Sequence, residues 1–323
     1  MRAVVVREVG GPQVLQYTEV ADPEPAAGQV VVDVEAAGVN YIDVYHRTGA
    51  YPLPLPFVAG SEGAGRVTAV GPGVDGVSVG DRVAWAMLPG TGYAERVAVP
   101  AERCVPVPDG VDTQTAAALM LQGLTAQYLT RSTFPIARGD VAVVHAAAGG
   151  VGLLLVQAVV ALGGRVIGTT STPAKADLAR EAGAEDVVLY SDDLRARVLD
   201  ATDGAGASVV YDGVGASTFD VSLGVLRRRG TMVLFGASSG SPPPFDPAQL
   251  GKKGSLFLTR PTLADHIVTR AELLDRARAL FGWVASGAVR PRIGHRYPLA
   301  QAAQAHTDLE ARRTTGKLLL LPE

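Results

Sequence analysis

The stretch that most constrains the fold of this chain is Val141–Gly152, which reads VAVVHAAAGGVG. Its first four residues form a short apolar, mostly β-branched run of the kind found in buried parallel strands. Small residues follow at once, and Val151–Leu162 then continues with helix-compatible spacing. The stretch therefore predicts a strand, a tight turn and the first turn of a helix.

The predicted turn carries a variant of the G-x-G-x-x-G motif, with Ala147, Gly149 and Gly152 at the three glycine positions. The middle glycine lets backbone approach a pyrophosphate, and the third lets the helix pack close to the strand. The N–H groups and dipole of a helix N-terminus then favour the anion. A glycine-rich turn without a ligand is the alternative. Because a second β-rich run follows at Arg165–Thr170, we favour dinucleotide binding.

Length, charge and cysteine content limit the possible classes of protein. A chain of 323 residues suggests two domains, and 47% hydrophobic with 19% charged residues suits a globular protein. The formal net charge of -3 gives no general attraction to nucleic acid or to an anionic membrane. The sequence has no signal-peptide pattern and no run of about 20 apolar residues. One cysteine, Cys104, excludes an internal disulfide and a Cys-rich zinc site, and we expect a cytoplasmic protein.

The arrangement of short runs along the chain predicts an α/β fold. Residues 1–110 contain β-type runs separated by Gly and Pro, which predicts a small barrel or sandwich. An Ala- and Leu-rich helix begins at Thr113, and strands then alternate with helices to about residue 260. The six expected strands are Val141–Val144, Arg165–Thr170, Asp186–Tyr190, Ser208–Asp212, Thr231–Phe235 and Ser255–Thr259. Six strands with helical crossovers predict a doubly wound parallel Rossmann sheet.

The end of the chain predicts how the domains are connected. A helix is expected over Arg270–Ser286, followed by the segment Tyr297–Glu310 and a closing apolar strand, Lys317–Leu321. That strand needs a sheet, and the β-rich N-terminal region is its natural host. We therefore expect a discontinuous, mostly β catalytic domain, residues 1–123 and 263–323, with the nucleotide-binding domain, residues 124–262, inserted in it.

Several segments in this order resemble the medium-chain dehydrogenase/reductase superfamily, specifically its zinc-free quinone oxidoreductase branch, which includes zeta-crystallin. The segments are Gly11-Pro12…Leu15, Gly38–Asp43 (GVNYID), Gly60–Gly65 (GSEGAG), Gly80–Val83 (GDRV), Gln122–Thr125 (QGLT), His145–Gly152, Tyr211–Gly215 (YDGVG), Phe235–Gly240, Gly254–Pro261 and Thr315–Lys317. The resemblance covers essentially the whole length. It implies a GroES-like catalytic domain around the Rossmann sheet.

Two positions depart from the zinc alcohol dehydrogenases of the same superfamily. Those relatives carry Cys where this chain has Asn40 and His where it has Ser61. A catalytic zinc needs about three protein ligands of Cys, His or carboxylate type. We therefore expect no metal site and no zinc-dependent alcohol chemistry. Glu62, which follows Ser61, is interpreted as structural.

The GVNYIDVYH loop carries the candidate catalytic residues Asn40, Asp43 and Tyr45. The resemblance places the matching residues near the nicotinamide, with Asn40 also contacting the cofactor. The alternative is a turn in which Asn40 and Asp43 hold backbone groups while Tyr45 packs across the domain interface.

Cofactor choice depends on the end of the second predicted Rossmann strand. An NAD site usually places Asp or Glu there to accept from the ribose hydroxyls. This chain has Gly168–Ser171 (GTTS), which contains no acid, and Lys175 and Tyr190 follow. The resembling family uses such a Lys and Tyr on the 2′-phosphate, so we expect NADP(H), although Lys175 could be only a solvated lysine.

The resemblance adds further cofactor contacts along the chain. Arg260 and Arg312 match arginines that lie near cofactor in relatives, although each could form a surface salt bridge instead. Thr125, on the expected helix with Gln122, is expected to help hold the nicotinamide side. The full expected cofactor set is Asn40, Thr125, Ala147, Gly149, Gly150, Val151, Gly152, Thr170, Ser171, Lys175, Tyr190, Phe235, Gly236, Ser238, Arg260 and Arg312.

These residues favour NADPH-dependent reduction of a small quinone, or another electrophilic acceptor, in an interdomain cleft. The alternatives are an enoyl or enone reductase of the same superfamily, with Tyr45 as proton donor, and a cofactor-bound protein without catalysis. No nucleic acid or membrane partner is expected. The apolar strands Thr231–Phe235 and Gly254–Thr259 end the predicted sheet, and an exposed edge of that kind favours a homodimer.

Overall fold

A computed structural model describes residues 1–322, which fold into two compact units. The first unit contains Met1–Leu124, Ile267–Phe281 and the described residues from Pro291 onward. The second contains Thr125–His266 and Gly282–Arg290. The domain boundaries expected at 123/124 and 262/263 stay predictions.

The second unit is built on a six-stranded, entirely parallel sheet with the order β11-β10-β9-β12-β13-β14. The strands are β9 (Val141–Val144), β10 (Arg165–Thr170), β11 (Asp186–Leu189), β12 (Ala207–Asp212), β13 (Leu226–Leu234) and β14 (Phe257–Thr259). The helices are α3 (Gly150–Ala161), α4 (Pro173–Glu181), α5 (Leu194–Asp200), α6 (Phe219–Gly224) and α7 (Ala248–Lys252). The chain order reverses beside β9, and a doubly wound sheet binds its ligand at such a point. The fold predicted from the alternating runs is confirmed.

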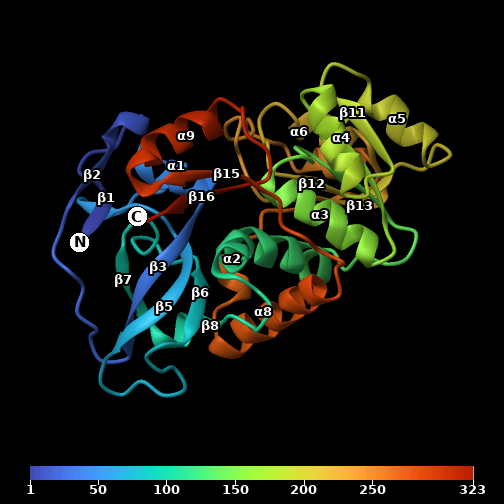
Figure 1. The fold of residues 1–323 in the computed structure, drawn as a ribbon. Coiled ribbons are helices and arrows are strands. Elements are labelled where there is room, and N and C mark those ends of the chain that lie inside the picture. The colour runs from blue at the N-terminus through green and yellow to red at the C-terminus, as the bar shows by residue number, and fades with distance from the viewer. Residues whose placement is uncertain (323) are drawn as a thin grey trace. The chain divides into compact units, whose positions relative to one another are not determined.

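The first unit contains a seven-stranded mixed sheet and a three-stranded sheet. The larger sheet has the order β15-β16-β3-β5-β6-β8, with β7 also on β3, and the smaller has the order β2-β1-β4 (Figure 1). The strands are β1 (Arg2–Val6), β2 (Leu15–Glu19), β3 (Gln29–Val39), β4 (Phe57–Val58), β5 (Glu62–Val70), β6 (Arg82–Ala86), β7 (Arg96–Pro100), β8 (Val105–Pro106), β15 (Ile293–Pro298) and β16 (Lys317–Leu321). The closing strand β16 pairs with β3, so the prediction that it joins the N-terminal sheet is confirmed.

The remaining helices begin in or belong to the first unit. They are α1 (Tyr41–Thr48), α2 (Thr113–Tyr128), α8 (Arg270–Ala285) and α9 (Ala302–Glu310). The unit boundary falls inside α2, after Leu124, and inside α8, after Phe281. A π-helical turn, Leu129–Thr133, follows α2 directly.

In the GVNYIDVYH segment, Gly38 and Val39 end β3 and Tyr41–His46 belong to α1, so its prediction as a loop is wrong. Asn40 has an extended backbone and stands at the N-cap of α1, and its N–H donates to Asp43 Oδ2 over 2.9 Å. Gly49 ends the helix in the left-handed region with φ of 80°. A side-chain acceptor at the third helical position and a left-handed glycine after the last turn are helix boundary signals. They stabilise a short helix despite its β-branched and aromatic residues.

The structure defines one segment whose form the sequence left open and shifts the start of one predicted strand. Tyr297 lies in β15, because Ile293–Pro298 pairs in parallel with β16, and only Ala302–Glu310 of the following segment is an α-helix. Strand β13 begins at Leu226, earlier than the predicted Thr231, because Leu226 pairs with Ala207 of β12; the register shifts before the next pair, Val209 with Thr231. In both cases pairing with a distant strand decides the local structure.

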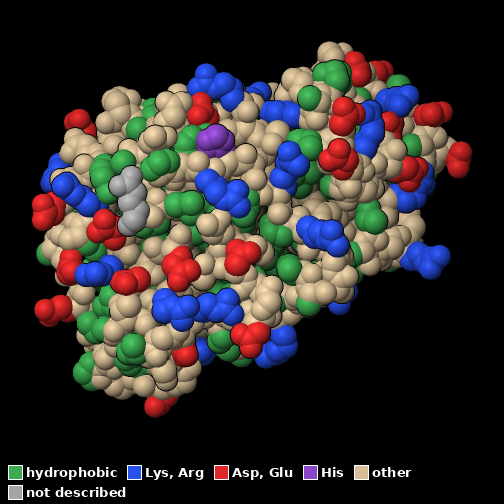
Figure 2. All heavy atoms as spheres, viewed as in Figure 1, with side chains coloured by type: hydrophobic (Ala, Val, Ile, Leu, Met, Phe, Trp, Pro, Cys, Tyr) green, Lys and Arg blue, Asp and Glu red, His purple; other side chains and the backbone are tan. Residues whose placement is uncertain are grey.

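Each unit has its own apolar core. One buried cluster includes Val32, Trp85 and Leu318 of the first unit, and the other includes Val143, Val210 and Met232 of the second. Within residues 1–322, no helix is both long and apolar enough to cross a membrane. Basic and acidic side chains are interspersed over the face drawn in Figure 2, as the small net charge would suggest.

Candidate active site

The fingerprint turn of the second unit has the geometry of an anion cradle. Ala146 adopts a positive φ of 50°, Ala147 N–H donates to Thr169 O over 2.9 Å, and α3 begins at Gly150 with Gly149 as its N-cap. A Cβ at Gly152 would lie 2.3 Å from Ala146 O, so no other residue fits there without backbone movement. The N–H groups of the first helical turn lack intrahelical partners and can bind a phosphate.

Tyr190 is brought to this turn from the end of β11. Its hydroxyl oxygen accepts a hydrogen bond from Ala146 N–H over 2.9 Å, and its ring lies nearly parallel to that of His145. Thr170, the last residue of β10, is buried, and Ser171 beside it is exposed. The end of β10 therefore carries hydroxyl groups and no carboxylate.

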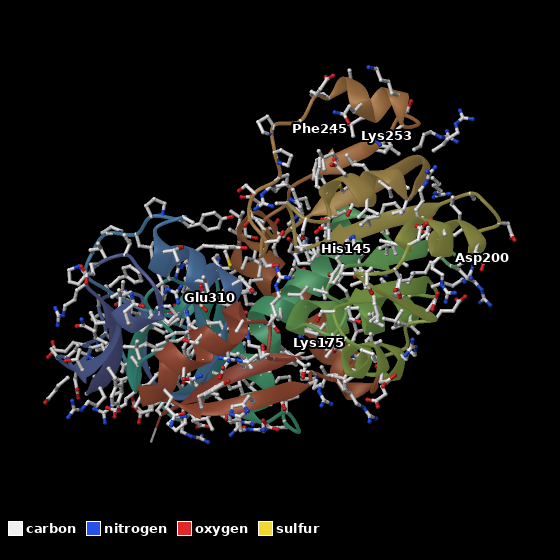
Figure 3. The ribbon with its side chains drawn as sticks, turned by 90° about the horizontal axis from the view of Figure 1, so that it is seen from above. His145, Lys175, Asp200, Phe245, Lys253 and Glu310 are labelled. Carbon is white, nitrogen blue, oxygen red and sulfur yellow. The ribbon has the colours of Figure 1, made fainter. Side chains whose placement is uncertain are left out.

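Lys175 lies in the first turn of α4, where its N–H donates to the N-cap side chain of Thr172 over 3.3 Å. Figure 3 labels Lys175 and His145, which both belong to the second unit. An ammonium group in the helix turn that follows β10 suits a ligand carrying an additional phosphate.

A buried hydrogen-bond network links the carboxyl ends of β9, β10 and β12. His145 Nδ1 lies 2.8 Å from Thr169 Oγ1, its Nε2 lies 3.0 Å from Ser222 Oγ, and the Ser222 hydroxyl donates to Asp212 Oδ2 over 2.8 Å. Burial lowers the pKa of His145, an effect that the Asp212 carboxylate opposes. The ring is thus kept neutral, as a bridge between the strand ends.

The same Asp212 carboxylate fixes the turn after β12. Its Oδ1 accepts from Val214 N–H and Gly215 N–H, and both of its oxygens accept from Thr218 Oγ1. The motifs HAAAGGVG and YDGVG contain His145 and Asp212, but the sequence assigned neither a role. A polar residue at or just after the carboxyl end of a buried strand was the signal that could have identified them.

The loop after β13 gathers three more predicted residues. Phe235 N–H donates to Asp212 O over 2.9 Å, and Ser238 N–H donates to Gly213 O over 3.2 Å. Gly236 approaches Gly213 so closely that a Cβ on it would lie 2.7 Å from Gly213 O. Arg260 joins them, because its guanidinium donates to Gly236 O over 3.2 Å. These residues form one side of the carboxyl edge of the sheet.

In the first unit, Asn40 is the centre of a buried polar cluster. Its Oδ1 accepts from Lys317 Nζ over 2.8 Å and from Gln122 Nε2 over 3.1 Å, while its Nδ2 donates to Glu62 Oε1 over 2.6 Å. Glu62 and Lys317 form a buried ion pair, and Leu121 N–H donates to the other oxygen of Glu62 over 2.6 Å. Lys317 and Gln122 were not predicted as site residues. The Asn40 side chain is held by charges on both sides.

Asp43 lies beside this cluster and is held by three donors. Its carboxylate accepts from Ser61 Oγ over 2.8 Å, from Asn40 N–H over 2.9 Å and from Tyr93 OH over 3.2 Å. Burial raises the pKa of Asp43 to about 6, although the hydrogen bonds from Ser61 and Asn40 oppose the shift. Asp43 therefore fixes the start of α1.

A chain of side chains runs from Asp43 to the end of α9. Tyr93 OH lies 3.0 Å from His306 Nε2, and Arg47 Nη1 lies 3.4 Å from His306 Nδ1. Arg47 also donates to both carboxylate oxygens of Glu310, which is labelled in Figure 3. Because arginine only donates, His306 accepts at Nδ1 and donates at Nε2, and Tyr93 then donates to Asp43. The hydrogen bonds from Arg47 through His306 and Tyr93 therefore point toward the Asp43 carboxylate.

Tyr45 forms an aromatic pair that the sequence did not predict. Its ring centroid lies 5.0 Å from that of Tyr51, which is partly exposed just after α1. Tyr51 stands in an aromatic and proline-rich run, YPLPLP, and that composition was the available signal. Two tilted aromatic rings offer apolar faces on which a flat ligand can pack.

The predicted residues thus fall into a group in each unit. The fingerprint, Tyr190, Phe235, Gly236, Ser238 and Arg260 come together in the second unit, and Asn40, Asp43 and Tyr45 in the first. Thr125 is buried in the part of α2 that belongs to the second unit. Arg312 follows α9 in the first unit, with a positive φ of 56°.

No metal-binding cluster accompanies these groups within residues 1–322. No set of three His, Cys, Asp or Glu side chains in that part of the chain could hold an ion. Asn40 and Ser61 instead bond to Glu62 and Asp43, respectively. An amide and a hydroxyl group are poor zinc ligands.

The sequence is similar to known dehydrogenases over nearly its full length. The family model of the alcohol dehydrogenase GroES-like domain matches residues 26–109, and that of the zinc-binding dehydrogenase matches residues 150–277. A quinone oxidoreductase of Pseudomonas aeruginosa is 48% identical over 315 residues, which cover 97% of each chain. A 2-haloacrylate reductase of a Burkholderia species is 40% identical over 330 residues, which cover 99% of each chain.

Solved structures give the same result. A mycobacterial protein solved in complex with NADPH superposes with a TM-score of 0.97, at 50% identity and with 100% of both chains covered. The sheet order of the second unit and the β-rich first unit are those expected of this fold. The chain therefore belongs to the quinone oxidoreductase branch of the medium-chain dehydrogenase/reductase superfamily, a family of oxidoreductases.

Proposed function

We propose that this chain reduces small quinones with NADPH and without zinc. The observation that carries the proposal is the carboxyl edge of the second unit's sheet. There an anion cradle at Gly149–Gly152 lies beside the end of β10, which carries Thr170 and Ser171 in place of an acid. Lys175 lies in the first turn of the following helix, α4. The NADPH complex of the mycobacterial relative supports this choice of cofactor.

The residues present fit a phosphorylated dinucleotide. Gly152 lies so close to Ala146 O that it cannot carry a side chain. The turn therefore presents only backbone there, as binding of a pyrophosphate requires. In the proposed complex the first turn of α3 binds the pyrophosphate, Lys175 pairs with the 2′-phosphate, and Asn40 orients the nicotinamide side. NADPH supplies the hydride, and the chain's task is to orient both partners and exclude water.

The side chains of the first unit support a quinone as the substrate that accepts the hydride. Alcohol oxidation needs a metal or a proton relay to remove the hydroxyl proton. The Asn40 amide donates to Glu62, the Ser61 hydroxyl donates to Asp43, and Glu62 pairs with Lys317. These three side chains therefore offer an alcohol neither a metal ion nor a proton relay. A quinone is already electrophilic, and its reduced oxygens take protons from water. The Tyr45–Tyr51 pair suits a flat acceptor.

An enone or enoyl reductase is the second candidate, and the 40% identity to a 2-haloacrylate reductase favours it. That reaction adds hydride at the β-carbon and also needs a proton at the α-carbon. Tyr45 would be the proton donor. The two candidates therefore differ in whether the Tyr45 hydroxyl is required.

A substrate panel with NADPH tests the proposed function. We expect NADPH oxidation with small ortho- or para-quinones and little activity on alcohols or aldehydes. Tyr45→Phe should reduce quinone turnover only modestly, whereas enone reduction through Tyr45 would fall by about 10²–10⁴. Tyr17→Phe, on β2, is the control. A wild type that ignores every quinone but turns over enones or enoyl thioesters would establish the second candidate instead.

Lys175→Ala should weaken NADPH binding by about ten- to a hundredfold and NADH binding much less. A charge-assisted hydrogen bond to the 2′-phosphate is worth roughly 1.5–3 kcal/mol, which corresponds to that range. Titration of both cofactors against both proteins measures the difference. Lys252→Ala, an exposed lysine at the end of α7, is the matched control. Equal losses for NADPH and NADH would contradict the role of Lys175.

Purified active protein should contain no stoichiometric zinc and should keep its activity in a chelator. The physical reason is the donor set, since an amide and a hydroxyl replace the thiolate and imidazole that hold catalytic zinc. Elemental analysis and assays with and without chelator check both statements. One zinc ion per active chain would refute them.

The protein should form a homodimer through the β14 edges of two copies. Strand β14 ends the parallel sheet, and Phe257 on it is 60% exposed. An exposed apolar edge strand is prone to pair with another strand. Light scattering should give twice the 33.4 kDa chain mass at micromolar concentration. A mass of one chain would contradict this prediction.

A further inference from the structure

One buried carbonyl beside Asn40 has no hydrogen-bond partner. Within the described chain, the buried side-chain atoms without a partner are Arg103 Nε, Gln122 Oε1 and Thr133 Oγ1. Gln122 is only 8% exposed, and it lies in α2 against the Asn40 cluster. Buried polar atoms are nearly always paired, so an unpaired acceptor at a candidate site suggests that a ligand supplies the donor.

The orientation of the Gln122 amide is fixed by charges behind it. Gln122 Nε2 donates to Asn40 Oδ1, which also accepts from the Lys317 ammonium. Turning the Gln122 amide over would place its oxygen against Asn40 Oδ1. Turning the Asn40 amide as well would place its NH₂ against the ammonium and its oxygen against the Glu62 carboxylate, to which Asn40 Nδ2 now donates. The unpaired atom of Gln122 is therefore the acceptor.

An acceptor of this kind selects the chemistry of its partner. A quinone carries only carbonyl acceptors and cannot satisfy Gln122 Oε1. The primary carboxamide of a nicotinamide ring carries N–H donors in both the oxidised and the reduced cofactor. The phenolic O–H of a hydroquinone product is the other donor that the proposed reaction provides, but it exists only after turnover.

We propose that Gln122 Oε1 accepts a hydrogen bond from the carboxamide N–H of the nicotinamide, and thereby selects that ring over analogues without the amide. The inference rests on the proposed function, because it requires a nicotinamide cofactor. Asn40 and Lys317 then act as positioning residues, since they fix the direction in which the Gln122 carbonyl points. The signal in the sequence was the glutamine in QGLT, which directly follows the apolar run Ala116–Leu121 of the same helix.

The test compares NADPH with the reduced 3-acetylpyridine analogue, in which a methyl group replaces the carboxamide NH₂ and the carbonyl remains. The dissociation constants of both are measured by fluorescence titration. Wild type should bind NADPH about three- to tenfold more tightly than the analogue, as expected for one neutral hydrogen bond. Gln122→Met should bring that ratio to about one. Gln114→Met is the matched control on the same helix, because Gln114 pairs with Arg296, and it should keep the wild-type ratio.

The ratio of the two dissociation constants shows which part of the argument fails. If a water molecule satisfies Gln122 Oε1, Gln122→Met changes both dissociation constants equally, and the inference is wrong. If Gln122→Met weakens inhibition by the hydroquinone while the cofactor ratio stays at its wild-type value, the carbonyl binds the product, and the carboxamide assignment is again overturned. If wild type binds neither dinucleotide, the proposed function fails. Should Gln122→Met not fold, equal affinities of wild type for NADPH and the analogue would still refute the inference.

Discussion

Replacing Lys317 by methionine should lower the free energy of unfolding by about 3–5 kcal/mol, because it leaves a buried carboxylate without its counter-charge. The side chains of Lys317 and Glu62 are 2% and 0% exposed. Without the ammonium, Glu62 would keep only the Asn40 amide and the Leu121 N–H as donors, and both are neutral. Chemical denaturation at neutral pH measures the loss.

A double-mutant cycle distinguishes the effect of charge from that of packing. The double variant Glu62→Gln/Lys317→Met removes both charges and so leaves no buried charge without its partner. It should therefore be more stable than Lys317→Met alone. Lys252→Met, an exposed lysine on α7, should change stability by no more than about 0.5 kcal/mol. A double variant no better than Lys317→Met would show that the ion pair is not the cause.

The second large effect is a loss of stability in acid that depends on His306. Burial lowers the pKa of His306 from 6.5 to about 3, and the Arg47 guanidinium adds to the shift. Between these values the unfolded chain binds a proton that the folded chain does not, so stability falls as the pH falls. Well below pH 6.5 each pH unit costs about 1.4 kcal/mol. The loss between pH 6.5 and pH 4.5 is about 2.3 kcal/mol, because half of the unfolded chains already carry the proton at pH 6.5.

His306→Gln should remove this acid dependence, because glutamine stays neutral. Asp43, which Tyr93 joins to His306, acts in the opposite direction. Its pKa is raised to about 6, so between about pH 6 and 3.8 the folded chain binds the extra proton and gains stability as the pH falls. The difference between wild type and variant isolates His306 because Asp43 is present in both. The prediction would be contradicted if the free energy of unfolding changed equally with pH in wild type and His306→Gln from pH 7 to 4.5.

The sequence identified the nucleotide unit better than the cluster around Asn40. Alternating apolar runs indicated the six Rossmann strands, because each buried strand needs its own local pattern of β-branched residues. Lys317 could not be found in the same way. It lies 277 positions from Asn40, and a lysine at the start of an apolar strand ordinarily indicates a solvated strand end. Only the pairing of β16 with β3 brings its ammonium into the cluster.

The segment after β3 shows the same limit on a smaller scale. GVNYID was recognisable as a motif, but the structure of its residues depends on Asp43 capping the backbone of Asn40 and on the donors of Ser61 and Tyr93. Tyr93 and His306 come from distant parts of the chain, so the network that holds Asp43 has no local signature. Gln122 is similar, because its unpaired carbonyl is visible only when the positions of its neighbours are known.

The family, the six Rossmann strands, the glycine-rich turn at Gly149–Gly152 and the lack of an acid after β10 were all predictable from the sequence, because each depends on residues close together in the chain. Tertiary structure decided how Asn40 is held between Lys317, Glu62 and Gln122, which Gln122 atom is left without a donor, and why His306 stays neutral. These properties arise from burial and from charges contributed by distant strands, and the pattern of a single segment does not encode them.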